Sequence, residues 1–243
     1  MSTISHQRLA ETFVQVADTL VDEFDLIDFL TLVTERAAEL AGAAASGLLL
    51  SDEQGRLQFM AASTESAKVL ELFQVQQEEG PCQDCFRDGV RVSHRDLTVD
   101  VDGWPRFAPR AVAAGFRSVH AFPLRHHQTL IGALNVFDAE PRTYSDEESV
   151  LLQALADVAA IGILQERAIR RGELLTEQLQ RALNSRITIE QAKGALAQMH
   201  GTTPDVAFDR LREYSRSHHQ RLTDVAAAVL TEPGSHPALT TLP

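Results

Sequence analysis

Residues 186–194 read Arg-Ile-Thr-Ile-Glu-Gln-Ala-Lys-Gly, and this stretch decides the fold of the C-terminal part of the chain. At about 100° per residue, Ala192 and Leu196 share one side of a helix, which predicts that this side is packed. Arg186 and Lys193 share a second side. The stretch therefore predicts a helix that packs along one side and offers cations on another.

Two shorter helices are expected after this stretch. Gly201 tolerates a left-handed helix cap, Thr203 can cap a new N-terminus, and Pro204 suits a first helical turn. The third helix is expected from about Asp224, with Thr223 as its cap. The residues expected on the buried sides of these two helices are Ala207, Phe208, Leu211, Val225, Ala226, Val229 and Leu230.

Three spaced blocks of this region resemble the ANTAR family. They are Ile-Glu-Gln-Ala-Lys-Gly at 189–194, Ala-Phe-x-x-Leu-Arg-x-x-Ser at 207–215 and Leu-x-x-Val-Ala at 222–226. The resemblance implies an RNA-binding domain of bacterial antitermination regulators. Such a domain holds paired stem-loops of a nascent transcript and so prevents a terminator hairpin. The implied partner is RNA with two hairpin loops.

The charge balance of this region favours loop bases over a duplex as the target. Residues 184–243 carry six basic and six acidic side chains, so bulk counterion release supplies little binding energy. Sequence-specific RNA recognition usually relies on contacts to unstacked loop bases. From spacing alone, the cationic residues are better explained as solvated helix residues, whereas the family resemblance favours RNA binding. A DNA-binding helical regulator is a further alternative. The residues that we expect to bind RNA are Arg186, Gln191, Lys193, Arg212, Ser215 and Arg216.

The composition of the whole chain is that of a globular protein with two domains. It has 243 residues, of which 44% are hydrophobic and 23% charged. No apolar run approaches the roughly 20 residues of a membrane span, and we expect a cytoplasmic protein without membrane contact. Residues 1–164 carry 25 acidic and 12 basic side chains. This acidic part repels phosphate, so nucleic-acid contacts are expected in the C-terminal part.

The first 160 residues alternate helices and strands. Ser145 and Glu148 form a capping box that opens a long helix, and the segment from Asp100 to Arg110, which holds the single Trp, is expected to be a surface loop. Before this segment we expect helices at 6–20 and from a cap at Asp28, strands at 47–51 and 57–61, a helix opened by Thr64, a helical turn after Pro81 and a strand at 90–92. After it we expect strands at 118–123 and 130–137.

This order resembles the GAF domain, a sheet sensor with helices packed across it. The segments Glu-Gly-Pro-Cys at 79–82 and Ile-Gly-Ala-Leu-Asn at 131–135 are similar to sequence motifs of the family. The expected fold class is α+β: an antiparallel GAF-like sheet with helices, a long coiled-coil helix and a three-helix ANTAR-like domain. The expected domains are a sensor at 1–160, a connector at 161–185, an RNA-binding domain at 186–231 and a flexible tail at 232–243. An unidentified small molecule is the implied signal.

The connector shows an imperfect coiled-coil pattern. The apolar members of an a/d series are Ile161, Leu164, Ala168, Leu175, Ala182 and Ile189, and the remaining slots hold Arg171, Gln178 and Ser185. This seam predicts a weakly held parallel homodimer. The alternative is one helix that folds back on its own sensor domain.

Cys82 and Cys85 lie one helical turn apart, which is the spacing of half a zinc site or of a redox pair. There is no second cysteine pair, and no histidine spacing completes a metal site. No basic neighbour in sequence lowers a thiol pKa, so we expect packed, reduced cysteines. Some GAF-like proteins reduce methionine sulfoxide with cysteines, so a thiol-dependent reductase or redox sensor is the alternative. With no nucleophile–base pair or phosphate loop, we expect no enzyme, cofactor or metal.

Overall fold

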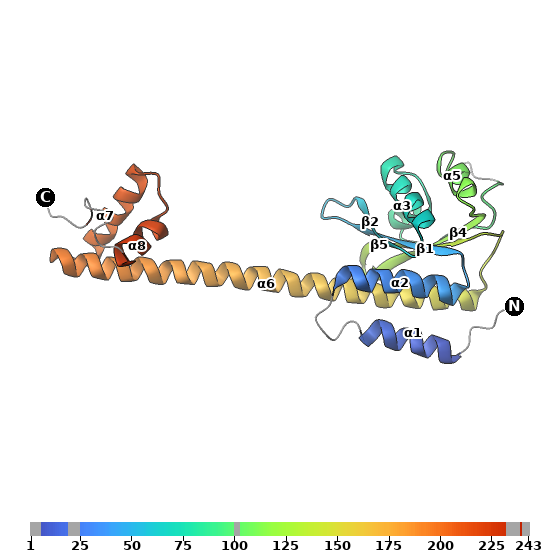
Figure 1. The fold of residues 1–243 in the computed structure, drawn as a ribbon, viewed down its shortest axis with the longest axis horizontal. Coiled ribbons are helices and arrows are strands. Elements are labelled where there is room, and N and C mark those ends of the chain that lie inside the picture. Colours follow the sequence, from blue (N-terminus) through green and yellow to red (C-terminus); the bar gives the residue numbers. More distant parts are fainter. Residues whose placement is uncertain (1–5, 19–24, 100–102, 232–238, 240–243) are drawn as a thin grey trace. The chain divides into compact units, whose positions relative to one another are not determined.

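The computed structural model describes residues 6–18, 25–99, 103–231 and residue 239 (Figure 1). The chain divides into two compact units, Met1–Ala168 and Ile169–Pro243. The helices are α1 (His6–Asp18), α2 (Leu26–Ala41), α3 (Glu65–Gln77), α4 (Pro81–Asp88), α5 (Phe107–Ala113), α6 (Asp146–His200), α7 (Pro204–Ser217) and α8 (Leu222–Thr231). The strands are β1 (Ala45–Ser51), β2 (Leu57–Ala62), β3 (Val92–His94), β4 (Ser118–His126) and β5 (Thr129–Asp138).

The first unit is built on a five-stranded antiparallel sheet with the strand order β2-β1-β5-β4-β3. The hairpin of β1 and β2 turns at Asp52, whose Oδ1 accepts the N–H groups of Gln54 and Arg56 at 2.9 Å each. The hairpin of β4 and β5 turns at His127, which has a φ of 53°. The predicted strands of both hairpins are confirmed, and β4 continues to His126, beyond its predicted end at residue 123.

Alternation of side chains along β1 gives the sheet two separate cores. Leu48 and Leu50 pack with α2 and with the first turns of α6. Leu49 points to the opposite face, where it packs with Cys82 and Cys85 of α4. Figure 1 shows α2 and α6 along one face and α3 and α5 over the other. Because helices cover both faces of the sheet, apolar residues occupy successive positions of β1, whichever face each side chain points to.

Polar residues tie the start of α6 to the sheet. Ser145 Oγ accepts the Glu148 N–H at 3.2 Å, and Glu148 Oε2 accepts the Ser145 N–H at 2.8 Å. Arg142 links this cap to β5, since its guanidinium lies 2.8 Å from Glu148 Oε1 and 3.1 Å from Asp138 Oδ1. The predicted capping box is confirmed, and Arg142 extends it to the sheet.

Four predicted element starts were wrong by two or three residues, and one of them is β1, which begins at Ala45 rather than at residue 47. Asp25 rather than Asp28 caps α2, because its Oδ1 accepts the Ile27 N–H at 2.7 Å. Strand β3 begins at Val92 rather than at residue 90, since the left-handed Gly89 has just ended α4. Helix α8 begins at Leu222, so Thr223 lies inside it.

The segment predicted as a surface loop contains α5 and buries Trp104, which is only 6% exposed. The indole N–H donates to Asp84 Oδ2 at 2.8 Å. Glu79 Oε1 accepts the Phe107 N–H at 2.8 Å and so holds the first turn of α5. Both partners come from the α3–α4 region, about twenty residues or more earlier in the chain. Local sequence therefore does not reveal them.

In the second unit the end of α6 packs with α7 and α8. Gly201 has a φ of 62°, and Thr203 Oγ accepts the Val206 N–H at 3.4 Å, so the predicted helix end and cap are confirmed. Leu230 is exposed and Phe208 is half-buried, where burial was predicted, because both lie at the margin of the packed side. The shared core consists of Ala192, Leu196, Ala197, Ala207, Leu211, Val225, Ala226, Val229 and Leu239. Apart from Leu239, the predicted tail lies outside the described residues.

Candidate functional site

Lys193 on α6 contacts one neighbour on its own helix and one on α7. Its Nζ lies 2.9 Å from Glu190 Oε2 on the same helix and 5.5 Å from the centre of the Phe208 ring. The Lys193 side chain is only 17% exposed. This cation is therefore preorganised, and part of its charge is already balanced by a carboxylate.

Three of the predicted RNA-binding residues present exposed guanidinium groups. They are Arg186 on α6 and Arg212 and Arg216 on α7. In the described part of the chain, none of these three groups forms an ion pair. A charged group that is exposed and unpaired pays little to exchange water for an acceptor on a ligand.

Two shallow surface grooves bring these residues together with their neighbours. Arg212 and Arg216 line one groove with Asp209, Glu213 and Ser217. The other groove is lined by Leu183, Arg186, Ile187, Glu190 and Gln191, so Gln191 lies beside Arg186. Each groove mixes cations with carboxylates, which favours specific hydrogen bonds over general attraction to phosphate.

Ser215 is buried, although it was predicted to bind RNA. It is 8% exposed, and its hydroxyl donates to the Gln220 carbonyl at 2.7 Å. This hydrogen bond joins the end of α7 to the turn before α8. Ser215 therefore stabilises that turn, and its hydroxyl is not presented to a ligand.

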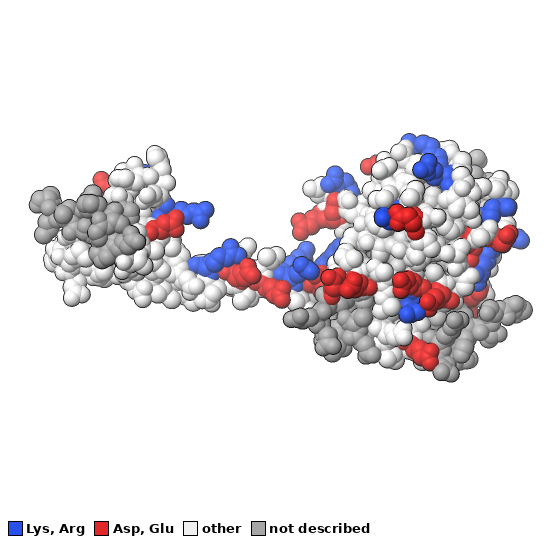
Figure 2. Space-filling view, in the orientation of Figure 1, with Lys and Arg blue, Asp and Glu red and all other residues white. Residues whose placement is uncertain are grey.

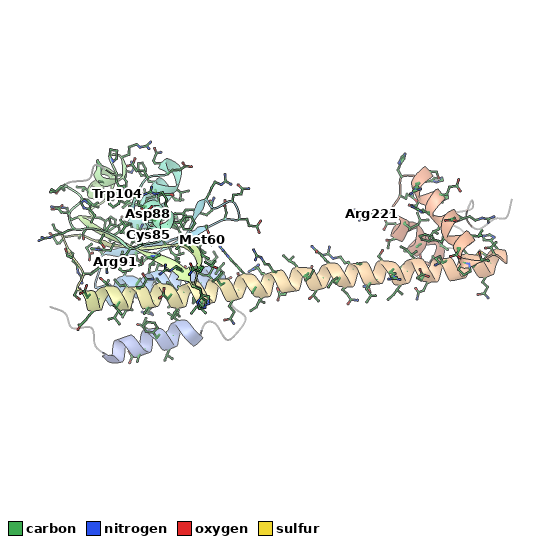
Figure 3. The ribbon with its side chains drawn as sticks, turned by 180° about the vertical axis from the view of Figure 1, so that it is seen from behind. Met60, Cys85, Asp88, Arg91, Trp104 and Arg221 are labelled. Atoms are coloured by element: carbon green, nitrogen blue, oxygen red, sulfur yellow. The ribbon has the colours of Figure 1, made fainter. Side chains whose placement is uncertain are left out.

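The two cysteines of the first unit are free and buried; Cys85 is labelled in Figure 3. Burial, the nearby Glu71 carboxyl and the second thiol raise the pKa of Cys82 well above its usual value. Burial raises the pKa of Cys85 to about 12. Since the thiolate is the reactive form, this environment favours packed, reduced cysteines over the reductase alternative. Among the described residues, no group of three or more metal-ligating side chains is found.

A buried carboxyl lies beside Cys82, and sequence reasoning missed it. Glu71 of α3 is fully buried, with Oε1 2.8 Å from Asn135 Nδ2 and Oε2 2.9 Å from Gln74 Nε2. Gln74 Oε1 in turn accepts the Cys82 N–H at 3.0 Å. Burial raises the pKa of Glu71 to about 8, against the lowering effect of the Asn135 amide. The buried Glu71 carboxyl is therefore mostly protonated at neutral pH.

Two glycines make room for this polar cluster. A Cβ at Gly47 would overlap the Glu71 side chain, and a Cβ at Gly80 would overlap Gln74. Gly80 also has a φ of 138°, a conformation that side chains disfavour. The space between α3, α4 and the sheet is therefore filled by the chain's own polar side chains.

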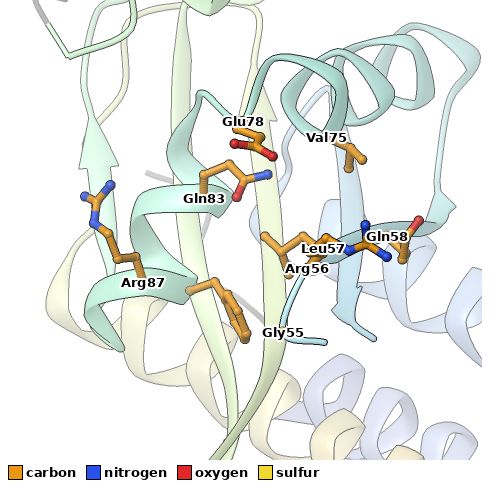
Figure 4. A pocket seen from close by; sticks show the side chains of 9 residues that line it. Gly55, Arg56, Leu57, Gln58, Val75, Glu78, Gln83 and Arg87 are labelled. Atoms are coloured by element: carbon orange, nitrogen blue, oxygen red, sulfur yellow. The ribbon is translucent and has the colours of Figure 1, made fainter. Parts of the chain in front are cut away.

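A groove at the edge of the sheet is lined by residues of β2, α3 and α4 and of the turns beside them (Figure 4). Arg56 in the groove pairs with Asp52 at 3.3 Å, and Arg87 pairs with Asp84 at 2.9 Å. The groove therefore offers amide groups, the ring of Phe86 and the exposed carboxyl of Glu78. It is lined by Gly55, Arg56, Leu57, Gln58, Val75, Glu78, Gln83, Phe86 and Arg87.

Comparison with known proteins assigns both units. A family model of the GAF domain matches residues 25–164. This chain belongs to the GAF domain family. A second model, of the ANTAR domain, matches residues 177–230. Both predicted resemblances are thereby confirmed. A comparison with curated proteins gave no match.

Solved GAF domains share the fold of the first unit. The GAF domain of an Acinetobacter phosphoenolpyruvate-protein phosphotransferase is 16% identical, with a TM-score of 0.54 over 69% of this chain and 99% of that chain. A GAF domain of the corresponding Coxiella burnetii protein is 20% identical, with a TM-score of 0.54 over 69% and 99%. The free methionine-R-sulfoxide reductase of Neisseria meningitidis is 17% identical, with a TM-score of 0.52 over 69% and 96%. At these identities the likeness concerns the fold alone.

The GAF–ANTAR chain combines a sensor domain with an RNA-binding domain of antitermination regulators. This domain content is that of a regulator. Among the described helices, none has both the length and the apolar character of a membrane span.

Proposed function

We propose that this protein is a homodimeric transcription antitermination regulator. Each protomer binds one of two stem-loops in a nascent transcript and so prevents a terminator hairpin from forming. A signal at the GAF domain shifts the equilibrium between two arrangements of the dimer and thereby controls RNA binding.

The observation that carries the proposal is the pair of exposed, unpaired arginines on α7 of the ANTAR domain. Arg212 and Arg216 lie one helical turn apart and line one groove. Figure 2 shows acidic and basic side chains next to each other on the face it presents. Binding therefore relies on a few directed contacts, which suits splayed loop bases better than a regular duplex.

Exposed leucines on α6 support the dimer. Leu175, Leu179 and Leu183 follow one another at four-residue spacing and are 56%, 62% and 52% exposed. A second copy of the helix would remove this apolar strip from water. Leu179 and Leu183 were absent from the predicted seam, so the proposed contact surface shifts toward them.

A titration of a dual-hairpin RNA and of a duplex DNA of the same length, at one fixed salt concentration, tests the proposal. The expected result is preferred binding of the RNA by the full-length dimer. Arg212→Ala should weaken RNA binding about tenfold. The matched control is Arg210→Ala, which removes the same charge from another side of α7.

Three outcomes would contradict the proposal. Preference for duplex DNA would favour the alternative of a DNA-binding regulator. Equal RNA affinity of Arg212→Ala and the unmodified protein would remove the proposed groove from the interface. Equal losses in Arg212→Ala and Arg210→Ala would show a general charge effect rather than a site.

A further inference from the structure

Two aromatic rings stack at the end of α7. The centres of the Tyr214 and His218 rings are 3.9 Å apart, and the ring planes differ by 15°. Tyr214 is half-buried against the core of the ANTAR domain, whereas His218 is exposed. The imidazole therefore lies between a ring anchored in the core and solvent.

Hydrogen bonds fix the orientation of the His218 ring. Its Nδ1 lies 3.0 Å from the Tyr214 carbonyl oxygen and 3.0 Å from Ser217 Oγ. A carbonyl oxygen only accepts hydrogen bonds, so Nδ1 carries the proton and donates. The backbone N–H of His218 also donates to the Tyr214 carbonyl, at 3.1 Å. The ring is thus held in one rotamer before any ligand arrives, which lowers the entropic cost of binding.

We propose that His218 is a stacking platform for one unpaired base of the RNA loop. This inference rests on the function proposed above and adds a base-stacking residue to it. Every nucleobase has a π face, and a flat ring with a fixed plane is the usual support for a splayed base. The helix C-terminus carries partial negative charge, so this position suits a neutral base better than a phosphate.

The platform serves a different nucleotide from the arginines. At about 100° per residue, His218 lies on another side of α7 from Arg212 and Arg216. The turn that follows holds the exposed Arg221, labelled in Figure 3, which is available to the backbone of the same nucleotide. A loop that curves around the end of α7 would meet the arginine groove and then the platform.

Fluorescence of 2-aminopurine, placed at each loop position of the dual-hairpin RNA in turn, tests the inference. Stacking quenches this base, so one position should be quenched on binding. His218→Ala should abolish that quenching and weaken binding roughly tenfold. His218→Phe keeps a flat ring and should retain both. The control is His219→Asn, because residue 219 has a φ of 53° that asparagine tolerates.

The outcomes separate this inference from the proposed function. If the unmodified protein binds no RNA, the function itself fails. If it binds RNA but His218→Ala leaves affinity and quenching unchanged, the function stands and the platform is refuted. If His218→Phe is as weak as His218→Ala while both keep native circular dichroism, the ring does not act by stacking, and the inference is also overturned.

Discussion

Replacement of Glu71 by glutamine should flatten the pH dependence of the sensor domain's stability. The folded protein holds the Glu71 proton with a pKa of about 8, against an ordinary value of 4.5. Between these values the folded state keeps a proton that the unfolded state has released. The free energy of unfolding therefore falls as pH rises, by about 1.4 kcal/mol per pH unit, or about 3 kcal/mol between pH 5 and pH 7.

Glutamine cannot ionise, so Glu71→Gln should lose this slope while it fills the same space. Its amide oxygen can keep accepting from Asn135 Nδ2, as Glu71 Oε1 does at 2.8 Å. His120 acts in the opposite direction, because burial lowers its pKa to about 4 and its contribution to stability grows as pH rises. That contribution is common to both proteins and cancels in the difference.

Urea unfolding at pH 5, 6, 7 and 8 measures the effect, with tryptophan fluorescence as the probe. The single Trp of the sequence, Trp104, is buried in the sensor domain and reports on that domain alone. Glu65→Gln on the same helix is the matched control, since Glu65 is exposed. Equal pH slopes for Glu71→Gln and the unmodified protein would refute a carboxyl that is neutral in the folded interior.

Three further predictions concern RNA binding, the dimer and the thiols. Arg212→Ala should lower RNA affinity about tenfold at fixed salt, as gel-shift titration measures, with no change in dimer mass. Leu179→Asp should convert the proposed dimer to a folded monomer in sedimentation experiments, because a charge replaces an exposed leucine on the proposed contact surface of α6. Cys82 and Cys85 should react with a thiol reagent at pH 8 only after urea is added, since burial raises the pKa of both thiols; rapid reaction of the native protein would contradict this.

Elements that depend on neighbouring residues could be predicted from the sequence. Ser145 and Glu148 contact each other across three positions, so their capping box is visible in the chain itself. The same holds for the Thr203 cap. In each of these places the hydrogen-bond partners are at most four residues apart.

The interior of the sensor domain could not be predicted in this way. On α3 the structure buries Leu70, Glu71 and Gln74 and exposes Val69 and Leu72, against the usual order of polarity. The main reason is a contact between Glu71 and a residue 64 positions away, which no local pattern encodes. The apolar residues of α3 therefore do not predict that the Glu71 carboxyl is buried.

For the predicted RNA-binding residues, too, local spacing predicted some features and missed others. Helical spacing was sufficient to place Arg212 and Arg216 together on one side of α7. It did not reveal that the Ser215 hydroxyl is used by Gln220, or that Tyr214 supports a histidine ring. Those contacts depend on how the chain turns after the helix.

Gly47 and Gly80 leave room behind α3 that Glu71 and Gln74 occupy, because a Cβ at either glycine would overlap one of these side chains. A small molecule that enters between α3 and the sheet would have to expel Glu71 into water. There the acid would regain its ordinary strength and lose its proton at neutral pH. Ligand uptake by this route would acidify the medium by up to one proton per chain, a signal that calorimetry in buffers of different ionisation enthalpy can count.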